Sequence, residues 1–438
     1  MAEIGIIGAG AAGLAAAWEL ALNGHQVTIF ESEPQVGGLA AGFRDEAWEW
    51  TLEKFYHHWF QSDKDLLQLA DELGVRHKIL FPRPKTSLWF NGNFYQIDGA
   101  ISALKTRYLT WPEKLRFGLV MLYLRLSKQW RWMEKYTADA WLRRYFGRRL
   151  YEKMWRPLLI GKFGVLYNEA NMAWMWARLY SRTSRLGTYE RGFQAFLEDF
   201  AAVLMAKGVQ FRFGTPVTCV ERQADGKIRL ESQTGTAVFD AVISTVSPRL
   251  LLKMIPTLQG DYARKVNSLR SMGAVVVILA LKHKLMTDGT YWLSLPADTP
   301  DKTQNEFPFL ALVEHTNYMD RRHFGGDCLV YLGDYVSPDH GYFQMSEEDL
   351  KNLFTAPLHK INPNFSPDWI RKWWVFRAPY AQPLPTVNHA QNIPDLRTPL
   401  PGIYWASMSQ VYPWDRGTNY AVEIGRRVAR LAMEDMHI

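Results

Sequence analysis

The first 31 residues place a strand, a glycine-rich turn, a helix and a second strand in immediate succession. Residues 3–8 include three isoleucines, and the turn reads Gly-Ala-Gly-Ala-Ala-Gly over positions 8–13. Apolar residues then recur at helical spacing to about residue 23, and a second apolar run over 26–30 ends at Glu31. This order is typical of a parallel sheet covered by helices, so it predicts an α/β fold.

The residue types in this turn match what a bound diphosphate needs. Gly8 allows the tight turn out of the strand, Gly10 lets backbone approach a pyrophosphate, and Gly13 lets the helix pack closely on the sheet. The N–H groups at the helix start, including that of Ala12, attract phosphate, while Glu31 suits the ribose hydroxyls. The segment therefore predicts dinucleotide binding. The alternative is a glycine-rich turn in an ordinary parallel-sheet domain.

A second glycine pair, Gly37-Gly38, follows six residues after Glu31. A nicotinamide dehydrogenase does not generally need such a pair. A longer cofactor does, because it passes close to the backbone a second time. Glycine triplet, acid and glycine pair together resemble the start of the FAD-dependent amine oxidase superfamily. That superfamily includes protoporphyrinogen oxidases, carotenoid desaturases and, more distantly, UDP-galactopyranose mutases. The resemblance implies FAD as the cofactor, with Val217 contacting its adenine end through the backbone. Leu39 stands where members often have Arg, which removes one phosphate contact.

The C-terminal part of the chain resembles the superfamily's flavin segment. A strand around residues 402–408 is followed by a turn containing Asp415, Gly417 and Thr418, and then by a helix to about residue 434. The resemblance implies that this helix start faces the flavin N1–O2 edge, where reduced flavin carries negative charge that a helix N-terminus stabilises. Asp415 is a candidate to replace the acid that members place just after the terminal strand.

We therefore expect an α/β architecture in which a discontinuous, Rossmann-like FAD-binding domain carries an inserted α+β substrate domain. The FAD-binding domain is expected to comprise residues 1–60, 190–260 and 395–438. The substrate domain is expected to comprise residues 61–189, mainly helical, and 261–394. Strand-like runs crowd the latter without intervening helices, which predicts an antiparallel or mixed sheet.

Composition excludes several other classes of protein. With 438 residues, 47% of them hydrophobic and 22% charged, the chain suits two globular domains and not a disordered or fibrous protein. Two cysteines cannot form a disulfide framework, and neither a leader peptide nor an 18-residue apolar run is visible, so we expect a cytoplasmic protein. The net charge of +7 suits an anionic ligand or surface, but no nucleic-acid-binding motif accompanies it, so no nucleic-acid partner is expected.

One basic segment raises the question of a membrane surface. Residues 112–141 read as helical, with an apolar stripe of Phe117, Val120, Met121 and Leu124 between several lysines and arginines. Such a helix can lie on anionic lipid, at the periphery of a membrane. The solvated face of a partly buried helix explains the same pattern, and both interpretations stay open.

Four residues are candidates for catalysis. His57 and His58 follow the glycine pair in an aromatic-rich stretch, where an imidazole can move a proton or orient a substrate; packed histidines are the alternative. Lys162 lies in a stretch that resembles a substrate-domain segment of oxidase relatives and suits an anionic substrate group, with surface solvation as its alternative. Tyr380 lies in a loop resembling one that lines the flavin face, with a structural turn as the alternative. No metal site is expected, because adjacent histidines alone do not make one.

The sequence thus predicts an FAD-dependent oxidoreductase of the amine-oxidase-like class that acts on a small molecule. We expect hydride transfer from a substrate C–H bond, next to nitrogen or within an unsaturated and apolar system, to flavin N5. Oxygen or a quinone would then reoxidise the flavin. Two alternatives remain: a redox-neutral mutase that uses reduced flavin, as in UDP-galactopyranose mutases, and a non-catalytic flavin-binding protein. The sequence does not fix the oligomeric state.

Overall fold

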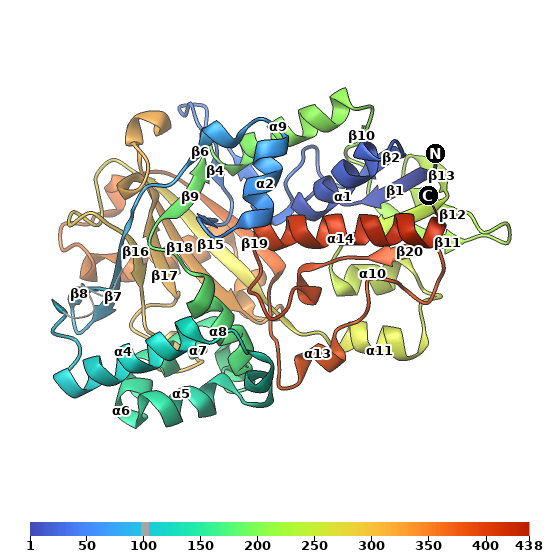
Figure 1. The fold of residues 1–438 in the computed structure, drawn as a ribbon. Coiled ribbons are helices and arrows are strands. Elements are labelled where there is room, and N and C mark those ends of the chain that lie inside the picture. The colour runs from blue at the N-terminus through green and yellow to red at the C-terminus, as the bar shows by residue number, and fades with distance from the viewer. Residues whose placement is uncertain (98–104, 438) are drawn as a thin grey trace.

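A computed structural model describes residues 1–97 and 105–437 of the chain. Its first layer is a five-stranded, all-parallel sheet with the order β10-β2-β1-β14-β20. Strands far apart in sequence are therefore neighbours in space, and the sheet unites the two ends of the chain with a middle segment (Figure 1). The strands are β1 (Glu3–Ile7), β2 (Gln26–Phe30), β10 (Gln210–Arg212), β14 (Ala241–Ser244) and β20 (Ile403–Trp405).

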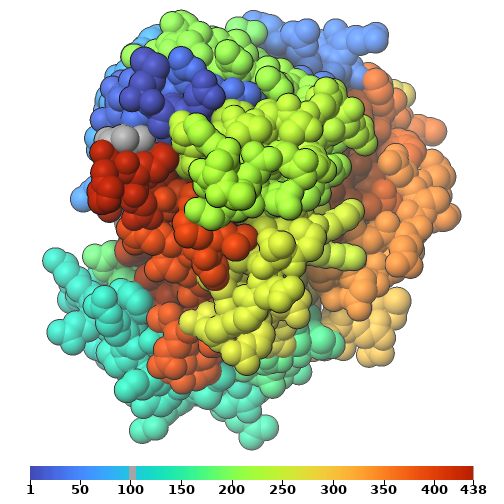
Figure 2. All heavy atoms as spheres, turned by 90° about the vertical axis from the view of Figure 1, so that its right-hand side faces the viewer, coloured from blue at the N-terminus to red at the C-terminus, as the bar shows by residue number. Residues whose placement is uncertain are grey.

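Helices cover one face of this sheet, and the chain segment of residues 217–258 covers the other. Ile4 and Ile6 of β1 are fully buried against the helices, whereas Ile7 packs on the opposite face with Phe239 and Leu251. The covering helices are α1 (Ala11–Leu22), α9 (Phe193–Ala206) and α14 (Thr418–Met436). In Figure 2 the N-terminal residues, in blue, lie beside the C-terminal residues, in red.

A seven-stranded sheet forms the second layer, with the order β19-β15-β18-β17-β16-β7-β8. All neighbouring strands are antiparallel except β16 and β7, so the expectation of an antiparallel or mixed sheet is confirmed. Its strands are β7 (Lys85–Phe90), β8 (Asn93–Gln96), β15 (Ser271–Leu281), β16 (Thr290–Ser294), β17 (Ala311–Glu314), β18 (Cys328–Val336) and β19 (Ile370–Pro383).

A lobe of helices packs against one end of this sheet. It contains α4 (Trp111–Leu126), α5 (Ala138–Phe146), α6 (Arg148–Leu150), α7 (Arg156–Phe163) and α8 (Met172–Ser181). The expectation of helix throughout residues 112–141 is wrong in one respect, because α4 ends before a loop and α5 begins afresh. Thr137 explains the restart, since its side chain accepts a hydrogen bond from the Ala140 N–H at 3.2 Å and caps α5.

Smaller elements complete the fold. An antiparallel sheet of β11 (Val217–Arg222), β12 (Ile228–Ser232) and β13 (Gly235–Phe239) lies near the parallel sheet. Short strands are β3 (Gly42–Phe43), β4 (Leu52–Glu53), β5 (Trp59–Phe60), β6 (Ile79–Leu80) and β9 (Leu186–Tyr189). Further helices are α2 (Lys64–Glu72), α10 (Pro248–Met254), α11 (Gly260–Ser268), α12 (Glu347–Thr355) and α13 (His389–Asn392). No helix within residues 1–97 and 105–437 has the length and apolar character needed to cross a bilayer.

Candidate active site

The three glycines of the turn between β1 and α1 are subject to different structural constraints. Gly8 has a φ of +105°, which residues with a Cβ rarely adopt. A Cβ on Gly13 would lie 1.9 Å from the carbonyl oxygen of Gly8, so the turn itself requires glycine there. Gly10 differs, because its φ of −78° is ordinary and a Cβ would have no neighbour nearer than 3.9 Å, the Cα of Gly38. The chain therefore does not need glycine at position 10 for its own packing.

Glu31 lies at the end of β2 with its carboxylate directed at the glycine turn. One carboxylate oxygen accepts a hydrogen bond from the Ala9 N–H at 2.7 Å, and the other accepts one from the Glu33 N–H at 2.9 Å. The residue is only 8% exposed. The Ser32 hydroxyl also donates to this carboxylate at 3.1 Å. Since a carboxylate has about four acceptor positions, about one is left for a ribose hydroxyl beside the turn.

The second glycine pair packs directly on the first turn. The Gly37 N–H donates to the Ala9 carbonyl at 3.0 Å, and a Cβ on Gly38 would lie 3.3 Å from the Cα of Gly10. Leu39 follows the pair and is half-buried against the helical lobe. Val217 begins β11, two residues after Thr215, whose N–H donates to the Glu31 carbonyl at 2.8 Å. Gly37 and Gly38 thus contact the turn directly, and Leu39 follows them in the chain. Val217 lies two residues from Thr215, which is bonded to the end of β2.

The starts of α1 and α14 offer unused hydrogen-bond donors. Gly10 and Gly417 are the N-cap residues, and within the described residues neither helix start has a side-chain cap or an acidic residue in its first turn. The first N–H groups of any α-helix have no acceptor within the helix, and they carry the positive end of its dipole. The two helices are held together, since a Cβ on Gly425 would lie 2.2 Å from the Ala12 carbonyl oxygen. Two donor-rich helix ends and an acidic strand end suit a long, diphosphate-bridged cofactor.

Asp415 lies two residues before the N-cap of α14, and its carboxylate is already engaged. It accepts hydrogen bonds from the Trp174 indole at 3.0 Å and the Gln382 amide at 3.2 Å, and it forms an ion pair with Arg178. Burial opposes its ionisation, but Arg178 and Lys162 nevertheless hold the pKa of Asp415 well below its usual range. These contacts link the C-terminal segment to the helical lobe. They compete with the expected contact of Asp415 to the ribityl chain, which stays a prediction.

A buried lysine lies close to this carboxylate. The Lys162 ammonium is 4.6 Å from the centroid of the Tyr335 ring, and the Arg416 guanidinium is 5.2 Å from the same ring. Among residues 1–97 and 105–437, the Lys162 ammonium has no hydrogen bond or ion pair. Burial, together with the positive charges of Arg178 and Arg416, lowers its pKa well below the usual value. Arg416 itself donates hydrogen bonds to the Tyr335 hydroxyl and the Ala381 carbonyl.

The paired histidines are partly buried between the two layers. Nδ1 of His57 lies 2.5 Å from the Phe55 carbonyl oxygen and must therefore carry the proton, while Nε2 of His58 is hydrogen-bonded to the Tyr291 hydroxyl. Loss of water around the rings lowers the pKa of His57 to about 4 and that of His58 to about 3. Both imidazoles are therefore neutral at pH 7, and Nε2 of His57 is an acceptor.

Tyr380 has a structural partner for its hydroxyl. That hydroxyl lies 2.7 Å from the Ser409 hydroxyl and accepts a hydrogen bond from the Ser409 N–H at 3.1 Å. It thereby ties β19 to the loop that follows β20. Its expected role as an aromatic wall for the flavin stays a prediction.

Comparison with known proteins places the chain in a family. The family described as flavin-containing amine oxidoreductases matches residues 11–433. The chain belongs to this family. Membership confirms the resemblance found in the sequence and implies a flavin cofactor, FAD.

Curated relatives include desaturases and oxidases. A 15-cis-phytoene desaturase of Synechococcus elongatus is 31% identical over 157 residues, which cover 32% of this chain and 33% of that protein. The mitochondrial protoporphyrinogen oxidase of Nicotiana tabacum is 25% identical over 190 residues, covering 42% of this chain and 37% of that protein. The matched segments thus span only about a third of the length of these relatives. They support an FAD-dependent oxidoreductase and leave the reaction and substrate open.

Solved structures extend the likeness to the whole chain. Cyclohexylamine oxidase from Brevibacterium oxydans superimposes with a TM-score of 0.73 at 15% identity, covering all of both chains. A reduced UDP-galactopyranose mutase gives a TM-score of 0.75 at 16% identity, covering 99% of this chain and 94% of that one. At this identity the likeness shows the fold alone, and it confirms the expected α/β class with an FAD-binding and a substrate part.

Several site residues of this family member were not found from the sequence. They contact Asp415 or Arg416 although they are far from both in the sequence, so no local sequence pattern identifies them. These residues are Trp174, Arg178, Tyr335 and Gln382. No group of three His, Cys, Asp or Glu side chains suited to a metal occurs in the described part of the chain.

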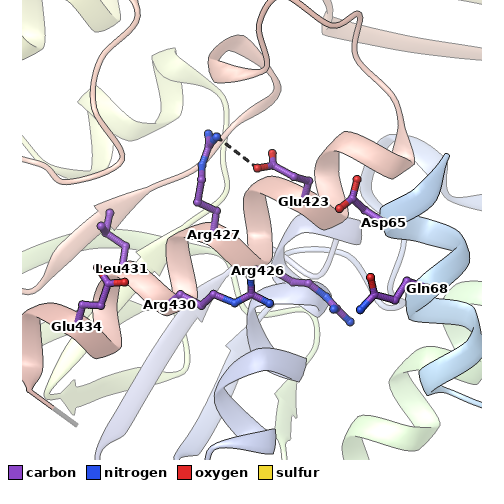
Figure 3. A pocket seen from close by; sticks show the side chains of 8 residues that line it. All are labelled: Asp65, Gln68, Glu423, Arg426, Arg427, Arg430, Leu431 and Glu434. Atoms are coloured by element: carbon purple, nitrogen blue, oxygen red, sulfur yellow. Dashed lines mark ion pairs between the residues drawn. The ribbon is translucent and has the colours of Figure 1, made fainter. Parts of the chain in front are cut away.

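A surface groove of about 490 Å³ lies between α2 and α14 (Figure 3). Its charges are matched within the protein, because Arg427 pairs with Glu423 at 3.3 Å and Arg430 with Glu19 at 2.7 Å, while Arg426 pairs with Glu72. The pairs of Arg426 and Arg430 connect α14 to α2 and α1, whereas the pair of Arg427 lies within α14. We assign no ligand to the groove.

Proposed function

We propose that the protein oxidises a small molecule by hydride transfer from a substrate C–H bond to N5 of FAD. That bond lies next to nitrogen or within an unsaturated system, and oxygen or a quinone accepts the electrons afterwards. The flavin supplies the redox chemistry when bound, and the protein supplies position, electrostatics and proton transfer.

The observation that carries the proposal is the buried Lys162 beside the start of α14, whose ammonium has no hydrogen bond or ion pair among the residues that the structure describes. Arg416 and Lys162 share the Tyr335 ring, and Arg416 directly precedes the N-cap of α14. Positive charge and uncapped N–H groups therefore gather at the place where the family resemblance expects the reduced flavin to be negative. Such an arrangement favours electron transfer into the cofactor.

Lys162 has a second role in this proposal, as the proton acceptor. Removing two hydrogen atoms from a substrate H–C–X–H unit yields C=X, one hydride and one proton. Burial and the neighbouring arginines lower the pKa of Lys162 and so favour its neutral form, which can take that proton. The C=X bond forms as the C–H and X–H bonds break.

The neutral histidines hold the substrate in this scheme. His57 presents an unprotonated Nε2, and a neutral ring accepts a hydrogen bond from a polar substrate group without adding charge. Tyr56 and Tyr331 pack edge to face at 5.8 Å nearby and keep water from this region. We also propose a cytoplasmic location, since Cys219 and Cys328 are both free thiols.

The test is anaerobic titration of the purified holoprotein with an amine, a polyene, a porphyrinogen and a sugar nucleotide, while flavin absorbance is recorded. The proposal expects one of these to bleach the flavin, and a substrate deuterated at the reacting carbon to slow the bleaching. Turnover that requires prior reduction and consumes no electron acceptor would instead identify the mutase alternative. A flavin that no compound reduces or uses would indicate a non-catalytic flavoprotein.

Lys162→Met separates proton transfer from binding of the cofactor. We expect flavin content to be retained and flavin reduction to slow by about a hundredfold or more. Lys162→Arg should not restore the rate, because a guanidinium stays protonated. Lys253→Met, at an exposed position on α10, is the matched control and should reduce its flavin at the wild-type rate.

A further inference from the structure

Helix α4 has two apolar faces, and only one of them is covered. Phe117, Val120, Met121 and Leu124 turn inward and pack in the helical lobe, as the sequence stripe suggests. The opposite face bears five further large apolar side chains that are between 56% and 74% exposed. They are Trp111, Leu115, Leu119, Leu122 and Leu126. A helix that is apolar on both sides is normally buried on both sides, so the outer face needs a partner.

The exposed residues form one continuous stripe. Their spacing of four, four, three and four residues places them within less than a quarter of the helix circumference. An apolar groove of about 240 Å³ adjoins the stripe and is lined by α4 and α5 residues and a tryptophan between them; its lining comprises Leu119, Val120, Tyr123, Trp132, Trp141 and Tyr145. α4 lies on the outside of the lobe, at the lower left of Figure 1. The surface formed by this stripe and groove is called the α4 face below.

The positive charge of the protein is concentrated around the α4 face. Residues 111–149 contain ten lysines and arginines and three acidic residues, an excess of seven that equals the net charge of the whole chain. The rest of the chain contains 41 lysines and arginines and 41 acidic residues, so its charges cancel. One of the three acids, Glu113, is paired with Arg149 at 3.1 Å.

Basic side chains flank the apolar stripe along α4 itself. At 100° per residue, Lys114 and Arg125 fall on one side of the stripe and Arg116 on the other. Arg116 donates to the Tyr145 carbonyl at 2.7 Å and Arg125 donates to the Arg182 carbonyl at 3.1 Å. Carbonyl oxygens fix these guanidinium groups in place without removing their charge.

We propose that the α4 face binds the surface of an anionic lipid bilayer. The apolar stripe enters the boundary between headgroups and acyl chains, and the surrounding lysines and arginines contact lipid phosphates. Trp111 and Tyr123 are of the type that occupies this boundary. This membrane contact does not depend on the proposed reaction.

Two other occupants fit the observations less well. A second copy of the chain in a symmetric dimer would bring the same positively charged surface against itself, which costs electrostatic energy. Nucleic acid would satisfy the charge but would leave five exposed apolar side chains in water. An anionic bilayer satisfies both features at once.

The test is sedimentation of the purified holoprotein with phosphatidylglycerol vesicles and with neutral phosphatidylcholine vesicles. We expect binding to the anionic vesicles that weakens as salt rises, and much weaker binding to the neutral ones. Leu115→Ser/Leu122→Ser should lower the partition coefficient by about tenfold or more. Leu22→Ser/Leu250→Ser removes two leucines that are 51% and 48% exposed elsewhere, and this control should bind like the wild type.

A charge-reversal pair completes the design. Lys128→Glu/Arg148→Glu should also reduce binding by about tenfold, whereas Lys64→Glu/Lys253→Glu, at exposed sites outside the segment, should reduce it much less. An equal loss of vesicle binding in the two charge-reversal variants would mean that net charge alone attracts the protein to the vesicles. This result would overturn the proposal. Absence of vesicle binding would overturn it as well. So would a lipid-free dimer that the Leu115→Ser/Leu122→Ser variant dissociates.

Discussion

Gly425 of α14 and Ala12 of α1 are in backbone contact: a Cβ on Gly425 would lie 2.2 Å from the Ala12 carbonyl oxygen. The two helix starts expected to bind the cofactor therefore belong to helices that touch. A separation between α1 and α14 would also alter the distance between the two ends of the FAD site.

Gly425→Ala is expected to lower the free energy of unfolding by about 1–3 kcal/mol, because the helices must move apart to admit a methyl group. It should weaken FAD retention at the same time. Thermal unfolding and flavin content measure the two effects. Gly118→Ala is the control, since a Cβ there meets nothing within 4 Å and alanine favours helix; its stability should equal or exceed that of the wild type.

Gly10→Ala is expected to yield a folded protein that has lost most of its FAD. The backbone of Gly10 suits any residue and the nearest atom to a Cβ is 3.9 Å away, so the added methyl group obstructs the cofactor and not the chain. Gly13→Ala should instead destabilise the apoprotein, because its Cβ would overlap the Gly8 carbonyl oxygen. Full flavin occupancy in Gly10→Ala would contradict the assignment of the turn.

Glu31→Ala is expected to weaken FAD binding by roughly fivefold to a hundredfold, or about 1–3 kcal/mol, through lost hydrogen bonds to a charged acceptor. Equilibrium titration of the apoprotein with FAD measures the effect. Glu31→Gln should fall between this variant and the wild type, because its side-chain oxygen can still accept from the Ala9 N–H. Unchanged affinity in Glu31→Ala would exclude a role at the ribose.

His57 and His58 predict a pH-dependent stability. Their pKa values fall from 6.5 to about 4 and about 3 on folding, so the unfolded chain binds more protons below pH 6.5. Each histidine therefore lowers the free energy of unfolding as the pH falls from 6.5 toward the folded-state pKa, by at most about 1.4 kcal/mol per pH unit.

Denaturant unfolding of His57→Asn beside the wild type, between pH 7.5 and 4.5, isolates this contribution. The variant should lose stability less steeply below pH 6.5, with no change in slope above pH 7. Parallel curves would show that the pKa of His57 is the same in the folded and the unfolded protein, contrary to the prediction. Asp63 acts in the opposite sense, since burial raises its pKa to about 7 and stabilises the fold at lower pH, so only the difference between the two curves is informative.

The cofactor side of the fold could be predicted because its signals are local. β1, α1 and β2 follow one another within 30 residues. The glycines between β1 and α1 indicate a tight turn and close packing of the backbone at this place. The family is confirmed over residues 11–433, and β1 and β2 are neighbours in the observed sheet. Its individual site residues and the domain boundaries stay predictions.

The substrate side of the fold was harder to predict from the sequence, because its contacts join residues that are far apart in the chain. Asp415 pairs with Arg178 across 237 positions, and Tyr335 receives both Lys162 and Arg416 from different elements. The spacing of residues in the sequence does not indicate contacts of this kind. The second apolar face of α4, which includes Leu115, Leu119 and Leu122, was not predicted, because the inner stripe alone is already typical of an amphipathic helix.

The five-stranded sheet has a consequence for the order of events during synthesis. β1 is synthesised more than 230 residues before its neighbour β14, and β20 and α14 are synthesised later still. A nascent chain that ends before residue 403 lacks the edge strand and the helix expected to complete the FAD site. We therefore expect the cofactor to bind only after α14 has been synthesised, and truncated translation products to be colourless.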